Sequence, residues 1–361
     1  MDIPLHVRLR RGFRSFLYTL LSSFIKQETS KELVDPREIQ TILIVRPNYR
    51  IGNLIFLTPL IEQLQKNIPN VQIDIIVGLK LAGDILQEIP SVDNVFALPR
   101  DVLYKPHKLF TLIKNVRAKK YDLVLNISGG SFSSQLVTLL TRAKYKASFE
   151  NKKRIIPLTH SIEKQNLFKH SGSQPLELLR LFPFELPKTS QQLNIFLTPK
   201  EEQKGKEELE KLLQTTTPLS SVKTVAIFRN ARFDKKIEDS WWTEWFEALR
   251  ELDNNIVVID VLSPDIPAKL HQDMLQYQNK NLRILGAFFK ATSLYISADT
   301  GPLHLALASN AKTLALFNKT SKEVYGTLGD ENLTLDINNL SPKDVALKTY
   351  QLLKGKNDVT T

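Results

Sequence analysis

The chain has 361 residues, of which 42% are hydrophobic and 24% charged, which excludes a disordered or low-complexity protein and provides enough apolar sequence for two domain cores. It contains no cysteine, which excludes disulfide frameworks, cysteine-ligated metals and thiol nucleophiles. Its 49 Lys and Arg exceed its 38 Asp and Glu by 11, and its six histidines lack metal-ligand spacing, so we expect an anionic partner and no metal site.

The first predicted element is an amphipathic helix over residues 5–26, followed by a polar connector to residue 40. Its apolar side chains recur at three- and four-residue spacing: Leu9, Phe13, Phe16, Leu17, Leu20 and Phe24. Arginines cluster near its start and no small-residue cleavage site follows, unlike a secretory signal. No run reaches about 18 uncharged apolar residues, so we predict no membrane-spanning helix. Two interpretations stay open: this helix lies on an anionic membrane surface, or it docks on the protein itself.

From residue 41, short apolar runs alternate with longer helical patterns, the order of a right-handed parallel α/β fold. In the first half we predict strands over 41–46, 71–77, 94–99 and 121–128, and helices over 52–67, 80–89, 106–119 and about 132–142. In the second half we predict strands over 223–228, 255–260, 293–299 and 311–317, and helices over 199–213, 240–252, from 301, and from 341 to about 354. Thr198 as N-cap, with Pro199 and Glu201, marks the start of the helix over 199–213.

The excess positive charge is concentrated in one part of the chain. Residues 100–170 contain 15 Lys and Arg but only 4 Asp and Glu, so the excess of 11 positive charges in this segment equals the excess of the whole chain. Such a segment indicates an anionic partner or a solvated basic face. Nucleic acid is the least favoured partner, because the chain has no nucleic-acid-binding motif and the segment lacks interleaved aromatic residues.

Two loops at the carboxyl ends of predicted strands are candidate ligand sites, because ligands of open α/β sheets bind at that edge. The first contains Arg46 and Gly52, and a glycine there lets a ligand or another backbone approach closely. The second precedes a helix whose first N–H groups favour phosphate oxygens. Its residues are Asp299, Thr300 and Gly301, followed by His304. Neither loop has the spacing of a P-loop or of a dinucleotide-binding motif.

The stretches IVRPNYRIGNLIFLTPL and ADTGPLHLALA together resemble glycosyltransferase family 9, the bacterial lipopolysaccharide heptosyltransferases. That family has a glycine–aspartate pair after its first strand and a D-T-G-x-x-H-L-A element in its second domain. The resemblance implies a GT-B type α/β fold, in which two Rossmann-like domains face a central cleft. It also implies an inverting, metal-independent reaction that uses a nucleotide sugar, typically ADP-heptose, as its donor substrate and needs no cofactor.

The family's organisation, applied to this chain, implies four segments: an amphipathic helix and connector (1–40), an acceptor-side domain (41–198), a donor-nucleotide domain (199–335), and a C-terminal helix and tail (336–361). The expected partners are a nucleotide sugar, an anionic lipid-linked core oligosaccharide and a membrane surface contacted through residues 5–26. We expect no nucleic acid partner. The resemblance favours a monomer on the cytoplasmic face of the inner membrane.

By position, the family implies that the donor diphosphate is held by Asp299, Thr300 and Gly301, with His304 close by. A family lysine that contacts donor phosphate stands two residues before a conserved tryptophan. Here Lys235 and Lys236 lie six and five residues before Trp241, so either lysine could reach the phosphate only through an insertion. We interpret Trp241 and the two tryptophans that follow it as helix packing.

The main departure from the family is Asn53, which stands where the family has its aspartate base. An amide does not usefully accept a proton near neutral pH. Three interpretations stay open: another carboxylate serves as the base, the enzyme works slowly through positioning and phosphate stabilisation, or the protein only binds. The glycine-rich donor stretch of the family is also replaced, by DVLSPDIP at 260–267.

The leading hypothesis is therefore a glycosyltransferase of lipopolysaccharide or lipooligosaccharide core assembly. It accounts for both loops, the basic segment and the cationic N-terminal helix. The alternative is a catalytically impaired homologue that binds a glycolipid or a partner enzyme, and Asn53 is its main support.

Overall fold

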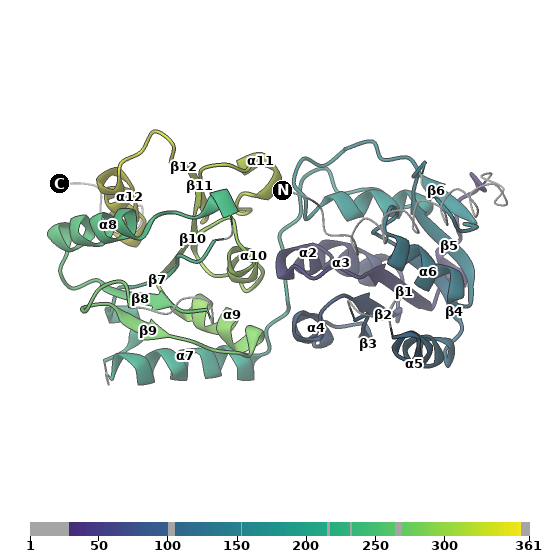
Figure 1. The fold of residues 1–361 in the computed structure, drawn as a ribbon, viewed down its shortest axis with the longest axis horizontal. Helices are drawn as coiled ribbons and strands as arrows, with labels where there is room; N and C mark the ends of the chain where they lie inside the picture. The colour runs from purple at the N-terminus through teal and green to yellow at the C-terminus, as the bar shows by residue number, and fades with distance from the viewer. Residues whose placement is uncertain are drawn as a thin grey trace. The chain divides into compact units, whose positions relative to one another are not determined.

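The computed structural model describes residues 29–99, 105–152, 154–214, 217–231, 233–263 and 269–354. The chain forms two compact units, and each contains a six-stranded parallel sheet (Figure 1). The first unit comprises residues up to Tyr49, Leu60–Leu167 and Ser173–Lys188; the second comprises Arg50–Pro59, Phe168–Gly172 and the chain from Thr189 onward. The parallel α/β prediction is confirmed, whereas the predicted helix over 5–26 lies outside the described residues. No helix in the described ranges is long and apolar enough to cross a membrane.

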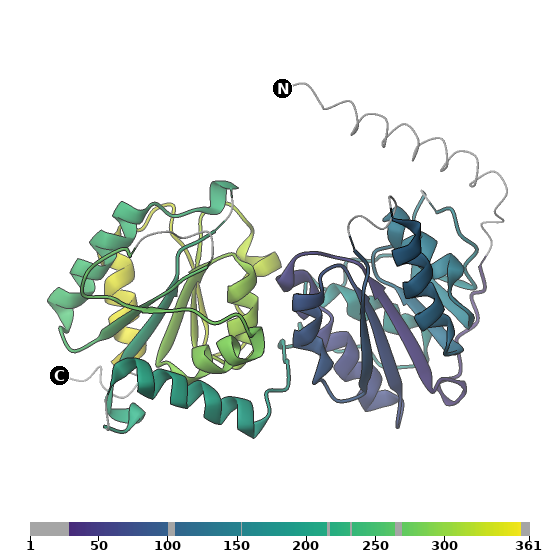
Figure 2. The ribbon, with the colours of Figure 1, turned by 60° about the horizontal axis from the view of Figure 1, so that its bottom comes forward.

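The sheet of the first unit has the order β3-β2-β1-β4-β5-β6. Its strands are β1 (Thr41–Arg46), β2 (Gln72–Val77), β3 (Val92–Ala97), β4 (Tyr121–Asn126), β5 (Ala143–Phe149) and β6 (His160–Ile162). Its helices are α3 (Thr58–Asn67), α4 (Lys80–Gln87), α5 (Pro106–Arg117) and α6 (Phe132–Leu140), with 3-10 helices over Pro36–Glu38 and Gln174–Leu181. The central strands read as continuous apolar runs because helices cover both faces of the sheet (Figure 2).

One core of this unit lies between the sheet and the helices α5 and α6. Leu43 and Val45 of β1 are fully buried there against Leu112 and Val116 of α5 and Val137 of α6. The residues between them on β1 point to the other face, as the two-residue period of a strand requires.

The predicted continuous helix over 52–67 is wrong: the chain forms α2 (Ile51–Ile55) and then α3, separated by a turn at residues 56–57. Pro59 explains the break, because its ring would clash with the carbonyl four residues earlier and it has no N–H for a helical hydrogen bond. Proline is tolerated in the first turn of a helix, and Pro59 stands there in α3.

The sheet of the second unit has the order β12-β11-β10-β7-β8-β9. Its strands are β7 (Thr224–Phe228), β8 (Val257–Val261), β9 (Leu275–Tyr277), β10 (Leu294–Ala298), β11 (Thr313–Phe317) and β12 (Leu333–Asp336). Its helices are α2, α7 (Pro199–Leu213), α8 (Asp239–Leu252), α9 (Leu282–Ala291), α10 (Gly301–Ala308), α11 (Lys322–Tyr325) and α12 (Pro342–Lys354), with 3-10 helices over Leu219–Ser221 and Phe233–Lys235. The predicted capping box of α7 is confirmed, since Thr198 and Glu201 each bond the other's backbone N–H.

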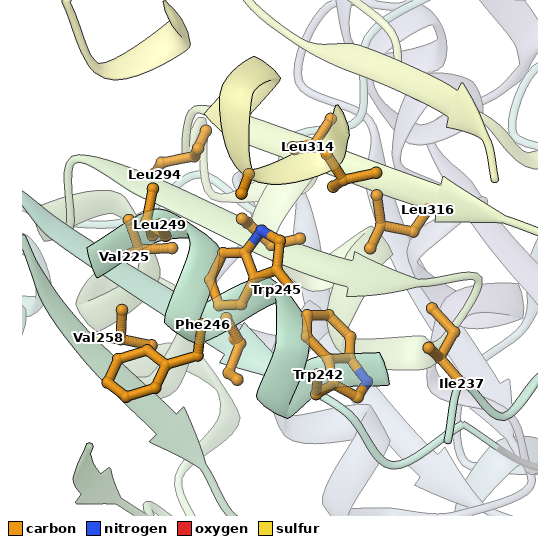
Figure 3. Close-up of a cluster of buried hydrophobic side chains, with 14 of the residues drawn as sticks. Val225, Ile237, Trp242, Trp245, Phe246, Leu249, Val258, Leu294, Leu314 and Leu316 are labelled. Atoms are coloured by element: carbon orange, nitrogen blue, oxygen red, sulfur yellow. The ribbon is translucent and has the colours of Figure 1, made fainter. Parts of the chain in front are cut away.

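The tryptophans of α8 belong to the core of this unit, as predicted. Trp242 and Trp245 are fully buried with Phe246 against the sheet residues Val225 and Leu314 (Figure 3). Helix α12 packs beside α8 on this face.

On the opposite face α7 lies along α9 (Figure 1). Arg283 of α9 is buried and forms a bidentate ion pair with Glu201 of α7, with N···O distances of 2.6 and 2.8 Å. Two planar groups paired in this way fix the orientation of both helices. The sheet is therefore held from both sides, which gives the loops at its edge a rigid base.

Candidate functional site

Three neighbouring strands of the second unit bring polar side chains to one edge of the sheet. Asp299 follows β10, Thr320 follows β11, and Lys235 ends the 3-10 helix after β7. Oδ2 of Asp299 accepts hydrogen bonds from Lys235 Nζ at 2.5 Å and from Thr320 Oγ1 at 2.9 Å. The carboxyl ends of adjacent parallel strands meet at one edge, so the strand order alone brings these distant residues together.

His304 contacts the other oxygen of the same carboxylate. Its Nε2 lies 3.4 Å from Oδ1 of Asp299, and both side chains are buried, with exposed fractions of 5% and 7%. Burial alone would raise the pKa of Asp299, but the hydrogen bonds from His304 and Lys235 outweigh it and lower the pKa to about 2. Asp299 is therefore ionised at neutral pH, where it accepts hydrogen bonds and does not supply a proton.

The start of α10 is capped by a side chain. Thr300 Oγ1 accepts a hydrogen bond from the N–H of Leu303 at 3.3 Å and shares another with Ser297 Oγ at 2.9 Å. Since Pro302 has no N–H and the N–H of Leu303 is bonded to the cap, Gly301 offers the amide at this helix start for an anionic oxygen. The resemblance assigns the hydroxyl of Thr300 to the donor diphosphate, but in this structure that hydroxyl caps the helix.

Helix α2 packs against the start of α10. A Cβ atom added to Gly52 would lie 2.6 Å from Cδ2 of His304, so only glycine permits this approach. The ring of Phe56 contacts the His304 ring edge-on, with 4.6 Å between centroids. Asn53 is half-buried on α2, and its side chain forms no hydrogen bond within the described parts of the chain.

His170 is a buried titratable residue that the sequence analysis did not identify. Its Nδ1 accepts a hydrogen bond from the N–H of Gly172 at 3.1 Å, so Nε2 carries the proton and donates it to the carbonyl of Gly326 at 3.2 Å. Burial, and then the nearby charge of His304, lower the pKa of His170 to about 4. It is therefore neutral at pH 7. Its ring packs edge-on against the ring of Phe56 on the C-terminal side of α2, with 5.7 Å between the ring centroids.

The two predicted phosphate lysines have different surroundings. Lys235 is half-buried on Asp299, with its Nζ also 5.9 Å from the ring centre of Tyr325, whereas the side chain of Lys236 is exposed. Arg46 ends β1 in the first unit, where burial lowers its pKa to about 10. Thr320 was missed, although its place just after the predicted strand over 311–317 was a usable signal.

Comparisons with known proteins show the family to which this chain belongs. The family model "Glycosyltransferase family 9 (heptosyltransferase)" matches residues 109–353. Lipopolysaccharide heptosyltransferase 3 of Escherichia coli is 24% identical over 295 residues, which cover 74% of this chain and 81% of that protein.

Two solved structures have a similar fold. The glycosyl transferase family 9 protein from Veillonella parvula DSM 2008 superposes with a TM-score of 0.73 at 15% identity, covering 88% of this chain and 98% of that one. The E. coli heptosyltransferase WaaC with ADP superposes with a TM-score of 0.68 at 17% identity, covering 86% and 99%. These similarities confirm the predicted GT-B type of fold, and the family match decides the class of protein: the chain belongs to glycosyltransferase family 9, the heptosyltransferase family, and is a glycosyltransferase.

Proposed function

We propose that this glycosyltransferase moves a heptose from ADP-heptose onto the inner core of lipopolysaccharide or lipooligosaccharide, with inversion at the anomeric carbon and without a metal ion. The observation that carries the proposal is the cluster of Lys235, Asp299 and His304 at the start of α10. The names of the relatives support it, since one is a lipopolysaccharide heptosyltransferase and the structure of another contains ADP.

The donor side follows from the charges at this cluster. Lys235 and the N–H of Gly301 are suited to bind the diphosphate oxygens of the donor. Asp299 is ionised and would repel a phosphate, so it is better suited to orient Lys235 and to accept hydrogen bonds from sugar hydroxyls. Negative charge grows on the leaving diphosphate as the glycosidic bond breaks, and a fixed cation at a helix start stabilises that charge. Thr300 then contributes by capping the helix.

We assign the acceptor to the first unit, where residues 100–170 concentrate the positive charge of the chain. A lipid-linked core oligosaccharide carries anionic groups that this charge would attract. The proposal includes a monomeric protein attached peripherally to the cytoplasmic face of the inner membrane, with no cofactor. Deletion of residues 1–27 tests the attachment through this segment: the protein should shift from the membrane fraction toward the soluble fraction while its affinity for ADP-heptose is unchanged.

A second candidate function is supported by Asn53. A general base contributes typically about 10²–10⁴-fold to such a reaction, and an amide does not supply it. A protein that retains the donor cluster but lacks the base would bind the nucleotide sugar or glycolipid and transfer slowly or not at all.

The test begins with donor binding. Thermal-shift titrations with ADP-, UDP-, GDP- and CMP-linked sugars should show the largest stabilisation by ADP-heptose. Asp299→Ala should lose that stabilisation, whereas Asp273→Ala, which removes an exposed aspartate paired with Arg250 elsewhere in the second unit, should keep it. An equal shift in both variants would remove the site assignment.

The second step measures transfer to a lipid A–inner-core acceptor. Turnover that persists in EDTA, and a product whose anomeric configuration is opposite to that of the donor by NMR, are the expected results. Donor binding without turnover would favour the binding-only function over the proposed one.

A further inference from the structure

Helix α5 carries an exposed face that takes no part in the donor cluster. Its buried side consists of Leu109, Leu112, Ile113 and Val116, which pack on the sheet. On the opposite side, spaced by three, four and three residues, lie His107, Phe110, Lys114 and Arg117, which we name the α5 face. Residues at this spacing lie along one line of a helix. The face therefore combines one aromatic ring with adjacent basic side chains.

Phe110 is unusual for a residue on a packed helix. Its side chain is 72% exposed, the largest value among the large hydrophobic residues of the described chain. Leaving a phenylalanine in water forfeits the favourable burial of its ring. Since the other side of α5 already packs on the core, helix packing within this unit does not explain an aromatic residue at this position.

The charged residues that flank Phe110 in the sequence are all basic, and Lys119 among them is paired with Asp93. Residues 105–120 contain six Lys and Arg and no Asp or Glu. Burial, followed by the charge of the nearby Arg117, lowers the pKa of Lys146 on strand β5. The positive charges of Lys146 and Arg117 repel each other, so a negatively charged partner would relieve an unfavourable interaction between them.

We propose that the α5 face docks on an anionic lipid bilayer, with the Phe110 ring inserted between headgroups and Lys114 and Arg117 against lipid phosphates. An aromatic ring flanked by cations on a convex helix suits the boundary between headgroups and acyl chains. The N-terminal segment is a poor alternative occupant, because residues 5–26 carry five Lys and Arg and no acid, the same sign as the α5 face. This surface lies outside the donor cluster and does not depend on which sugar the protein uses.

The absence of cysteine from the chain allows a direct test on the full-length protein. Phe110→Cys carries one environment-sensitive fluorophore, and Leu347→Cys, on an exposed helix position of the second unit, carries the same fluorophore as control. Vesicles of phosphatidylcholine with about one third phosphatidylglycerol should shift the emission at position 110 to shorter wavelength and leave position 347 unchanged, with little effect from pure phosphatidylcholine.

A second measurement uses unlabelled variants in vesicle sedimentation. Phe110→Ala should lower partitioning onto the anionic vesicles about tenfold, and replacing Lys114 or Arg117 by Ala about fivefold each, whereas Leu347→Ala should bind like the wild type. Circular dichroism and ADP-heptose binding should be unchanged in all variants, which separates this surface from the donor site.

The proposal is overturned if the protein sediments with anionic vesicles while the fluorophore at position 110 stays silent, because another segment would then carry the contact. Equal sedimentation of Phe110→Ala and Leu347→Ala would overturn it as well. A response at position 110 to soluble heparin but not to vesicles would identify an acidic macromolecule as the partner and reject the bilayer.

Discussion

The helices α2 and α10 each follow a buried parallel strand, but their first turns are built differently. Helix α10 has a threonine cap and, directly before it, the carboxylate of Asp299 held by three donors. Helix α2 has only five residues, no side-chain cap, and the amide of Asn53 at the position where the resemblance implies an aspartate. The turn at α10 therefore presents a cation and an ionised carboxylate, whereas the turn at α2 presents an uncharged amide. If the proposed roles of these two turns are correct, donor binding and catalysis can be tested separately in this protein.

The largest expected effect comes from restoring the carboxylate on α2. Asn53→Asp should raise kcat for transfer to the core acceptor by up to about 10²–10⁴-fold, with a smaller change in KM, because proton removal belongs to the transition state. Initial-rate kinetics at saturating ADP-heptose measure it, with the exposed Asn254→Asp as control.

A neutral or harmful Asn53→Asp in an efficient wild-type enzyme would mean that the base lies elsewhere. Glu238 and Asp239 would be tested next. Oδ1 of Asp239 forms an ion pair with Nη1 of Arg229 at 2.9 Å. Glu238, which is exposed at the start of α8, is therefore the better candidate of the two carboxylates.

Two adjacent lysines test whether the cation next to the α10 turn binds the donor phosphate. Lys235→Ala should weaken ADP-heptose binding about 10- to 100-fold, since hydrogen bonds to charged groups contribute about 1.5–3 kcal/mol. Lys236→Ala is the matched control and should bind normally, because its side chain is exposed. Isothermal titration calorimetry compares them, and equal losses would show that neither lysine is specific to the phosphate.

A pair of glycines tests the packing of α2 on α10. Gly52→Ala should destabilise the protein by about 1–3 kcal/mol, because the new methyl group forces the His304 ring to move. Gly301→Ala should cost less, since its Cβ would lie 3.3 Å from Cβ of Ile51 and a small shift relieves the contact. Urea unfolding measures both, and the reverse order would mean that the two helices are not tightly packed.

The smallest expected effect is on the pH dependence of stability and comes from His170, which packs against Phe56 next to α2. The pKa of His170 is about 4 when folded and near 6.5 when unfolded, so between these pH values the unfolded chain binds one more proton. The stability contributed by the neutral ring is present above pH 6.5 and declines toward pH 4, by at most about 1.4 kcal/mol per pH unit.

His170→Gln should remove this part of the pH dependence of the unfolding free energy, because glutamine can still donate a hydrogen bond to Gly326 but does not titrate. Urea midpoints from pH 4 to 7 compare the variant with the wild type. Parallel curves would contradict the assignment of the slope to His170.

Most of the central architecture was predictable from local pattern. The strands β1, β7, β10 and β11 are continuous apolar runs, and continuous burial on both faces is what a central parallel strand requires. By contrast β5, β6, β9 and β12 were not predicted. They are short or partly polar, and they lie toward the sides of the sheets, so pairing with a neighbour contributes more to them than their own sequence does.

The sequence by itself determined the class of the α10 turn: an acid, a capping threonine and a glycine at the start of a helix form a recognisable local unit. Only the tertiary structure decided which side chains complete it. Lys235 and not Lys236 meets Asp299, and Thr320 joins them, because the order β11-β10-β7 aligns the ends of strands that are far apart in the chain. Local periodicity reports which face of a strand or helix is buried, whereas hydrogen bonds between distant strand ends depend on strand order, which no local pattern contains.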